Sequence, residues 1–290
     1  MNFIFAVVIL AIIQGLAELL PISSSAHVII AEKLLGLDPT TPEMTLLLVM
    51  LHTGTMLAVI VYFWKSWKQT YFSSWRETRL NAKLLFLATV MTGIVGITVK
   101  TGIERYSFRN APKAEIESLF GNLPLIAIAL AAAGILIVYS GLWYHKVVNN
   151  QETPVRTKNA FWIGMIQGLC LPFRGFSRSG ATISSGLLTG ASKRPVEEFS
   201  FALAVILTPP VLVHEVMRLV KSHSVQVVSA TVPMMDLFLP GLFGLVCSFL
   251  AGLLALRWLS RWLERGKWHY FGYYCLFASA IVLLLHALGY

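Results

Sequence analysis

Two short polar stretches interrupt an otherwise apolar sequence, and both contain side chains suited to anion binding and proton transfer. The first reads QGLAELLPISSSAH from Gln14, and the second reads QGLCLPFRGFSRSGAT from Gln167. Glu18 follows Gln14 by four residues, so both project from one face of a helix and suit joint ligation of a hard divalent cation. A carboxylate among apolar residues is costly, which favours a functional role for Glu18 over a polar contact at a helix end.

Three serines and a histidine complete the first stretch. The run Ser23 to Ser25 precedes His27, which puts hydroxyl groups and an imidazole within a few helical turns of Glu18. Such groups can supply a nucleophile and a general acid or base. Ser24, His27 and an activated water are all open as the attacking group, and the alternatives are serines that cap a helix and a histidine that packs.

The second stretch contributes arginines. Arg178 lies between Ser177 and Ser179, and its planar fork of donors matches the oxygens of a phosphate. A structural ion pair between Arg178 and Glu18 is the alternative, and it is compatible with a phosphate site. Arg174 is explained equally well by substrate binding and by a side chain that reaches the surface.

The elements that must position these residues are two related hairpins. The stretches share Gln-Gly-Leu, then Leu-Pro, then a serine-rich turn, so they form an internal repeat. Each interrupts an apolar segment too short to span a bilayer, which predicts re-entrant hairpins over residues 3–31 and 161–188. Non-helical backbone at membrane depth is tolerated only where protein or a wet cavity satisfies it, so both tips should face one shared cavity.

Composition excludes an ordinary soluble fold. Of 290 residues, 56% are hydrophobic and 13% are charged, against about a quarter charged in soluble domains. Full membrane spans are expected at Met44–Trp64, Leu84–Val99, Leu123–Tyr144, Phe199–Val216, Leu237–Leu256 and Tyr270–Leu288.

These patterns predict an all-α polytopic membrane protein with a single membrane domain over residues 1–290. Two inverted-topology repeats, about 1–145 and about 159–290, should each contain a re-entrant helical hairpin followed by three transmembrane helices. The formal charge of +9 comes from scattered residues and forms no continuous stripe, so no nucleic-acid partner is expected. The basic loop that contains Lys65 and Arg76 should be cytoplasmic, which places both termini outside the cytoplasm.

Two further polar positions have ordinary explanations. His52, beside Thr53, lies inside an expected span and could line the cavity, but hydrogen bonding between helices explains it as easily. We therefore leave His52 out of the catalytic set. Glu198 follows Lys193 and Arg194, and we interpret it as an acid at a helix N-terminus.

The segments QGLAELLPISSSAH and GFSRSGATIS closely resemble the signature regions of the bacterial undecaprenyl-pyrophosphate phosphatase family, the bacitracin-resistance type. HTGTMLAVIVYFW and EEFSFALAV extend the resemblance over nearly the whole chain. The resemblance implies hydrolysis of undecaprenyl pyrophosphate to the monophosphate at the outer side of the bacterial cytoplasmic membrane. That reaction recycles the lipid carrier for peptidoglycan synthesis and confers bacitracin resistance.

The resemblance also assigns roles. It implies a divalent metal ion, magnesium or calcium, and suggests a homodimer. The expected catalytic residues are Glu18, Ser24, His27 and Arg178, the expected substrate-binding residues are Ser23, Ser25, Arg174, Ser177, Ser179 and Thr182, and the expected metal ligands are Gln14 and Glu18.

Two positions depart from the family pattern. Gln14 stands where Glu is frequent, and an Arg174-Gly175 pair with a one-residue insertion replaces the usual Pro-Gly, which changes the tip expected to hold the phosphates.

The main alternative function is a polyprenyl-phosphate flippase or another secondary transporter, since inverted repeats with broken helices are typical of carriers. Phosphoryl transfer explains the combination of Glu18, Ser24 and His27 better, because translocation needs no nucleophile or acid-base pair. In either case the isoprenoid tail of the substrate is expected between the spans, among membrane lipids.

Overall fold

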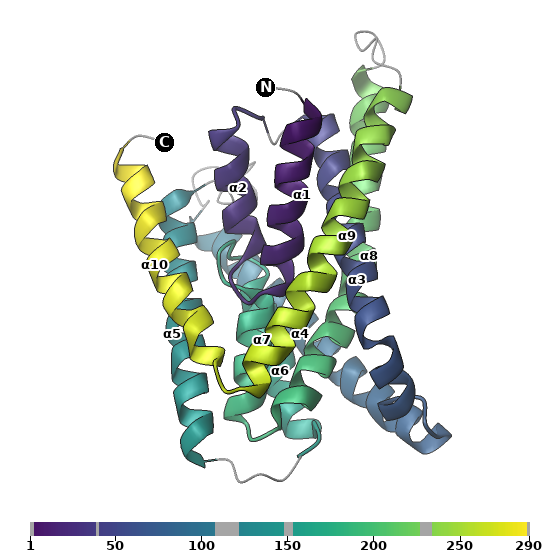
Figure 1. The fold of residues 1–290 in the computed structure, drawn as a ribbon, viewed down its shortest axis with the longest axis vertical. Helices are drawn as coiled ribbons and strands as arrows, with labels where there is room; N and C mark the ends of the chain where they lie inside the picture. The colour runs from purple at the N-terminus through teal and green to yellow at the C-terminus, as the bar shows by residue number, and fades with distance from the viewer. Residues whose placement is uncertain (1–2, 39–40, 108–121, 148–152, 227–233, 289–290) are drawn as a thin grey trace.

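The protein is almost entirely helical in the computed structural model, which describes residues 3–38, 41–107, 122–147, 153–226 and 234–288. Within these ranges there are ten helices and no strands (Figure 1). In chain order they are α1 (Phe3–Leu19), α2 (Ser24–Leu34), α3 (Pro42–Thr70), α4 (Trp75–Ser107), α5 (Leu123–Val147), α6 (Thr157–Cys170), α7 (Arg178–Leu188), α8 (Lys193–Gln226), α9 (Met234–Glu264) and α10 (Trp268–Ala287).

Five of the expected membrane spans are confirmed by length and composition. Helices α3, α4, α5, α9 and α10 are each long and apolar enough to cross a bilayer. The sixth expected span, Phe199–Val216, lies within α8, a helix of 34 residues in which several side chains fall outside the described part of the chain. The protein is therefore a multi-pass membrane protein.

Both expected helix interruptions are present. Residues 20–23 separate α1 from α2, and residues 171–177 separate α6 from α7. The polar stretch that begins at Gln14 does not itself end α1, which continues to Leu19. The reason is that Gln14 and Glu18 satisfy each other along the helix, with Gln14 Nε2 donating to Glu18 Oε2 at 3.2 Å.

The order of elements is the same in each half: two short helices, then three longer ones. The link between the halves includes residues 148–152, which lie outside the described ranges. In Figure 1, α1 begins at the end of the molecule where both termini lie, whereas α6 begins near the opposite end. The repeat boundaries near 145 and 159 stay a prediction.

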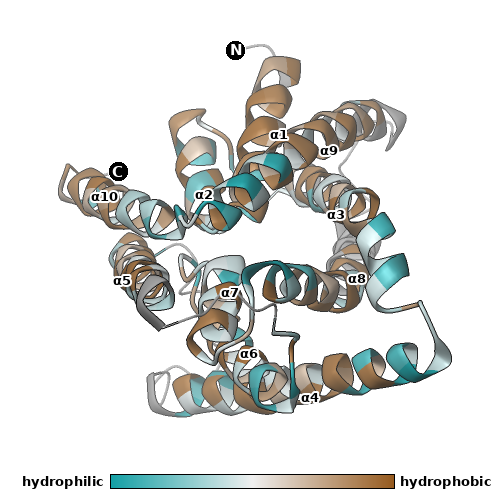
Figure 2. Ribbon diagram, turned by 60° about the horizontal axis from the view of Figure 1, so that its bottom comes forward, coloured by the Kyte–Doolittle hydropathy of each residue, from teal (hydrophilic) through white to brown (hydrophobic). Residues whose placement is uncertain are grey.

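Helix packing brings the two hairpin tips together. Helix α1 packs against α2, α3 and α9, and α7 packs against α5, α6 and α8, and Figure 2 shows α7 near the middle of the arrangement. A single buried cluster contains Leu20 and Ile22 of the first turn, Ile183 and Leu187 of α7, and Leu256 of α9. This shared apolar core holds the two interruptions side by side.

Candidate active site

Glu18 is the centre of the site, because its two carboxylate oxygens join the two hairpins. Ser24 Oγ donates to Glu18 Oε2 at 2.5 Å, within the first hairpin. Arg178 Nη2, from the second hairpin, donates to Glu18 Oε1 at 3.1 Å. The side chains of Glu18 and Arg178 keep 19% and 24% of their surface exposed, so the pair is largely enclosed but reachable. The ion pair considered as an alternative for Arg178 is therefore present.

The turn that presents Ser24 has an unusual backbone. Ser23 has φ 67° and is the one non-glycine residue with positive φ among those that the structure describes. Such backbone is unfavourable for a residue with a Cβ and tends to occur at functional sites. Ser23 makes no side-chain cap to α2, and its hydroxyl instead lies 3.3 Å from that of Ser25. Ser24 is thus the first residue of α2, directly beside Glu18.

His27 has a protein partner at each ring nitrogen. Its Nδ1 lies 2.8 Å from the Ser23 carbonyl oxygen, and its Nε2 lies 2.7 Å from the Tyr274 hydroxyl. A carbonyl oxygen can only accept, so Nδ1 carries the hydrogen and the neutral ring accepts from Tyr274. The Tyr274 ring also stacks on His27 with centroids 5.7 Å apart. Tyr274 is a site residue that the sequence analysis missed, because one more aromatic residue in an apolar span carries no distinguishing signal.

His52 lies closer to the site than the sequence analysis expected. Its Nε2 is 3.8 Å from Glu18 Oε2, within ion-pair range. Its Nδ1 lies 2.9 Å from the Leu48 carbonyl oxygen, so the ring bonds within its own helix and not to another. This position agrees with the alternative in which His52 lines the cavity, and its exclusion from the catalytic set stays a prediction. The sequence signal for His52 was a polar histidine inside an apolar span. The packing of α3 against α1 is what brings this side chain toward Glu18.

The second tip is built around glycine and a serine cap. The Ser177 hydroxyl accepts from the Gly180 backbone N–H at 3.2 Å and so caps α7. Gly175 has φ 103°, and a Cβ there would collide with the carbonyl oxygen of Ile126. Only glycine suits both constraints. The second tip, which contains the one-residue insertion, therefore packs closely against α5.

Arg178 retains a free donor. Its Nη1 is buried and has no hydrogen-bond partner, whereas its Nη2 binds Glu18. A buried unpaired donor is unfavourable and is normally satisfied by a protein group, water or ligand. Ser179 and Thr182, expected at this tip, are both buried, and Thr182 Oγ1 donates to the Arg178 carbonyl at 2.8 Å and lies 2.6 Å from Ser200 Oγ. They support the backbone that carries Arg178.

Glu198 does not cap a helix N-terminus. It lies beyond the first turn of α8, and its Oε1 accepts from Ser66 Oγ at 2.5 Å and from Arg194 Nε at 3.0 Å. The interpretation as a terminal acid was wrong because α8 starts earlier, at Lys193. Glu198 therefore ties α8 to the end of α3.

The donor set fits a hard cation only in part. In the described ranges no group of three His, Cys, Asp or Glu side chains could hold a metal ion. One carboxylate (Glu18), one amide (Gln14) and nearby hydroxyls suit magnesium or calcium if phosphate and water oxygens supply the remaining ligands, as is usual for magnesium.

The arrangement can activate a hydroxyl beside a bound anion. A serine hydroxyl donates to a carboxylate, and a guanidinium with a free edge lies on the other side of that carboxylate. Hydroxyl, base and anion-binding cation are the parts that acyl or phosphoryl transfer requires.

The chain matches the family model described as bacitracin resistance protein BacA over residues 7–281. It is 56% identical over 279 residues to Undecaprenyl-diphosphatase 2 of Acinetobacter baylyi, covering 96% of each chain. It is 29% identical over 290 residues to Undecaprenyl-diphosphatase of Bacteroides fragilis, covering 98% of each chain. It is 30% identical over 286 residues to Undecaprenyl-diphosphatase of Rhodopirellula baltica, covering 99% of each.

Proposed function

The chain belongs to the bacitracin resistance protein BacA family, and we propose that its undecaprenyl-diphosphatase activity resides in the cluster around Glu18. It is a membrane hydrolase that converts undecaprenyl pyrophosphate to undecaprenyl phosphate and inorganic phosphate. This reaction returns the lipid carrier to peptidoglycan synthesis, and bacitracin resistance follows from the same activity. The observation that carries the assignment of the site is that Glu18 binds Ser24 with one oxygen and Arg178 with the other.

Ser24 is the proposed nucleophile. Its hydroxyl donates to Glu18 at 2.5 Å, so a proton acceptor is already in place. The Ser24 oxygen attacks the terminal phosphorus, Glu18 accepts the proton, and the bond from that phosphorus to the bridging oxygen breaks. Undecaprenyl phosphate leaves, and water then cleaves the phosphoserine to release phosphate.

His27 is proposed to act through the turn and not as the attacking group. Both of its ring nitrogens are engaged, by Ser23 and by Tyr274. The bond to the Ser23 carbonyl holds the backbone that precedes Ser24. His27 therefore fixes where the nucleophile points.

Arg178 is proposed to hold the transferred phosphate. Its buried Nη1 is a donor without a protein partner, and phosphate oxygens would satisfy it. The N-terminus of α7 adds backbone N–H groups beside it, and negative charge is stabilised there. The Arg178 guanidinium and these N–H groups are already in place to stabilise the negative charge that develops on the phosphoryl oxygens.

Gln14 and Glu18 are the proposed ligands of a magnesium or calcium ion. When bound, the ion would neutralise charge on the phosphates and orient them. Because these two side chains are too few for a closed site, the substrate must contribute oxygen ligands.

The inverted repeat and the orientation are part of the same proposal. The repeated helix order and the opposite starting ends of α1 and α6 support two inverted-topology halves around a midplane site. Basic residues at the end of α3 and the start of α4, such as Lys68 and Arg76, support a cytoplasmic position for that end and an outward-facing site. We also retain a homodimer in the inner membrane as a proposal.

The test is phosphate release from undecaprenyl pyrophosphate by detergent-purified protein, with and without magnesium or calcium. Arg178→Ala and Glu18→Ala should each lower kcat by roughly 10²- to 10⁴-fold, while Arg76→Ala and Glu77→Ala, outside the site, should not. A folded wild type that binds the lipid but releases no phosphate would favour a flippase instead.

A further inference from the structure

Glu32 is a buried acid that the proposed reaction does not use. It lies near the end of α2 with 1% of its surface exposed. Its Oε1 is buried without a hydrogen-bond partner. Burying a carboxylate is costly unless a cation or another group compensates it.

The packing of α2 directs Glu32 toward the second hairpin tip. Ile29, one turn before Glu32, belongs to a buried cluster with Ile126 of α5. Gly175 of the second tip rests against the carbonyl oxygen of the same Ile126. The end of α2 and the tip therefore meet beside the first turns of α5.

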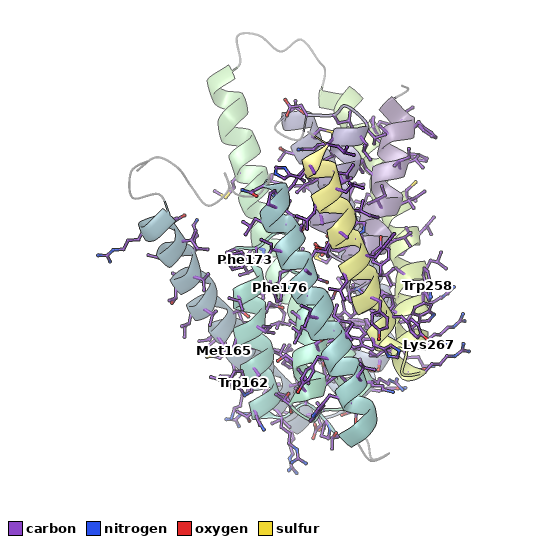
Figure 3. The ribbon with its side chains drawn as sticks, turned by 90° about the vertical axis from the view of Figure 1, so that its left-hand side faces the viewer. Trp162, Met165, Phe173, Phe176, Trp258 and Lys267 are labelled. Atoms are coloured by element: carbon purple, nitrogen blue, oxygen red, sulfur yellow. The ribbon has the colours of Figure 1, made fainter. Side chains whose placement is uncertain are left out.

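Arg174 is the cation at this meeting point. It directly precedes Gly175, and its charge acts electrostatically on the Glu32 carboxyl group. Phe173 and Phe176 flank Arg174 and Gly175 in the sequence. Figure 3 places these two phenylalanines about midway along the long helices. Arg174 itself is exposed, so part of its guanidinium can reach a ligand.

We propose that Glu32 is a positioning residue that holds Arg174 for the second phosphate of a pyrophosphate. This inference rests on the proposed function and deepens it. Glu18 and Arg178 form one acid-arginine pair between the hairpins, and Glu32 and Arg174 would act as a second such pair. A guanidinium has two donor edges, so Arg174 can face the carboxylate with one edge and a phosphate with the other.

Two arginines at one site divide the two phosphates of the substrate between them. Orthophosphate, which corresponds to the transferred phosphate, needs only Arg178, whereas the second, lipid-attached phosphate needs Arg174. Without Glu32, Arg174 loses the buried negative charge that acts on it, and its long side chain can turn toward the surface. The role of Glu32 is therefore in binding the substrate and not in the chemical step.

The experiment compares Glu32→Gln, Arg174→Gln, the double variant and the matched control Glu104→Gln, whose acid pairs with Lys100 on α4. Phosphate release from undecaprenyl pyrophosphate gives KM and kcat, and inhibition by orthophosphate gives Ki. Both single variants should raise KM about tenfold with kcat within about twofold, which indicates lost substrate binding. Ki for orthophosphate and all values for Glu104→Gln should stay unchanged.

The double variant decides whether the two residues act together. Its KM should be no higher than that of Arg174→Gln, because Glu32 has no effect once Arg174 is gone. Additive increases, an unchanged or lower KM in Glu32→Gln, or equal changes in KM and Ki would contradict the proposal.

A second measurement does not depend on turnover. Inorganic pyrophosphate should raise the Tm of wild type more than that of Glu32→Gln, while orthophosphate should raise both equally. A wild type that releases no phosphate would contradict the proposed function, and the Tm comparison would still test Glu32. Equal pyrophosphate shifts in both proteins would overturn its role.

Discussion

Ser24 and Glu18 lie on different helices of one hairpin, yet the Ser24 hydroxyl donates to the Glu18 carboxylate at 2.5 Å. The turn between α1 and α2 makes this contact, with Ser23 in a positive-φ conformation. The contact gives a hydroxyl a proton acceptor, and charge-assisted hydrogen bonds of this kind are strong.

Removing the hydroxyl should abolish most turnover. Ser24→Ala should lower kcat by on the order of 10³-fold or more, because the proposed nucleophile is lost while phosphate binding by Arg178 remains. Phosphate release measured alongside pyrophosphate binding checks this. Ser74→Ala, which removes an exposed helix-cap hydroxyl, should leave kcat unchanged. Activity in Ser24→Ala near that of wild type would instead indicate direct attack by water.

The shape of the Arg178 cation should matter as well as its charge. Arg178→Lys keeps a positive charge near Glu18 but loses the second donor edge, so kcat should fall roughly 10²-fold. Steady-state kinetics measures this, with Arg79→Lys as a matched change outside the site. If lysine supports full activity, then charge alone is sufficient and the free Nη1 has no role.

Tyr274 should contribute through His27. Tyr274→Phe keeps the ring that stacks on His27 but removes the hydroxyl at Nε2, so the Ser23 turn should be held less firmly. We expect kcat to fall about tenfold, in line with the loss of one hydrogen bond to a site residue. Kinetics and Tm together test this, since Tm should change little.

Tyr273→Phe is the control for that substitution, because Tyr273 is a half-exposed neighbour that packs on His269 instead. Comparable losses in both variants would mean that the effect is not specific to His27.

Gly175 should tolerate no side chain. Gly175→Ala combines an unfavourable φ of 103° with a collision against the Ile126 carbonyl. We expect a loss of roughly 1–3 kcal/mol in stability, seen as a lower Tm, and a loss of activity because the tip moves. Gly93→Ala, a helical position with no heavy atom within 4 Å of the added Cβ, should be neutral or slightly stabilising. An unchanged Tm in Gly175→Ala would show that the tip is not fixed by this contact.

The sequence alone determined most of the architecture. Long apolar runs predicted the spans because the bilayer requires continuous apolar helix, a local property of the chain. The two serine-rich interruptions indicated where helices end. Charged side chains are energetically unfavourable in apolar surroundings, and this indicated that Glu18 and Arg178 are site residues. Their ion pair was foreseen as an alternative, since opposite charges buried in one cavity must compensate each other.

Contacts between distant segments were decided only by the tertiary structure. Tyr274 reaches His27 from 247 positions away along the chain, and nothing local separates it from the other aromatic residues of its span. His52 needed the packing of α3 on α1, and Glu32 needed the packing of α2 on α5, which brings the end of α2 near the second tip. The physical reason is that hydrophobicity and turn chemistry depend on neighbours in sequence, whereas the direction of a polar side chain depends on which helix faces pack together.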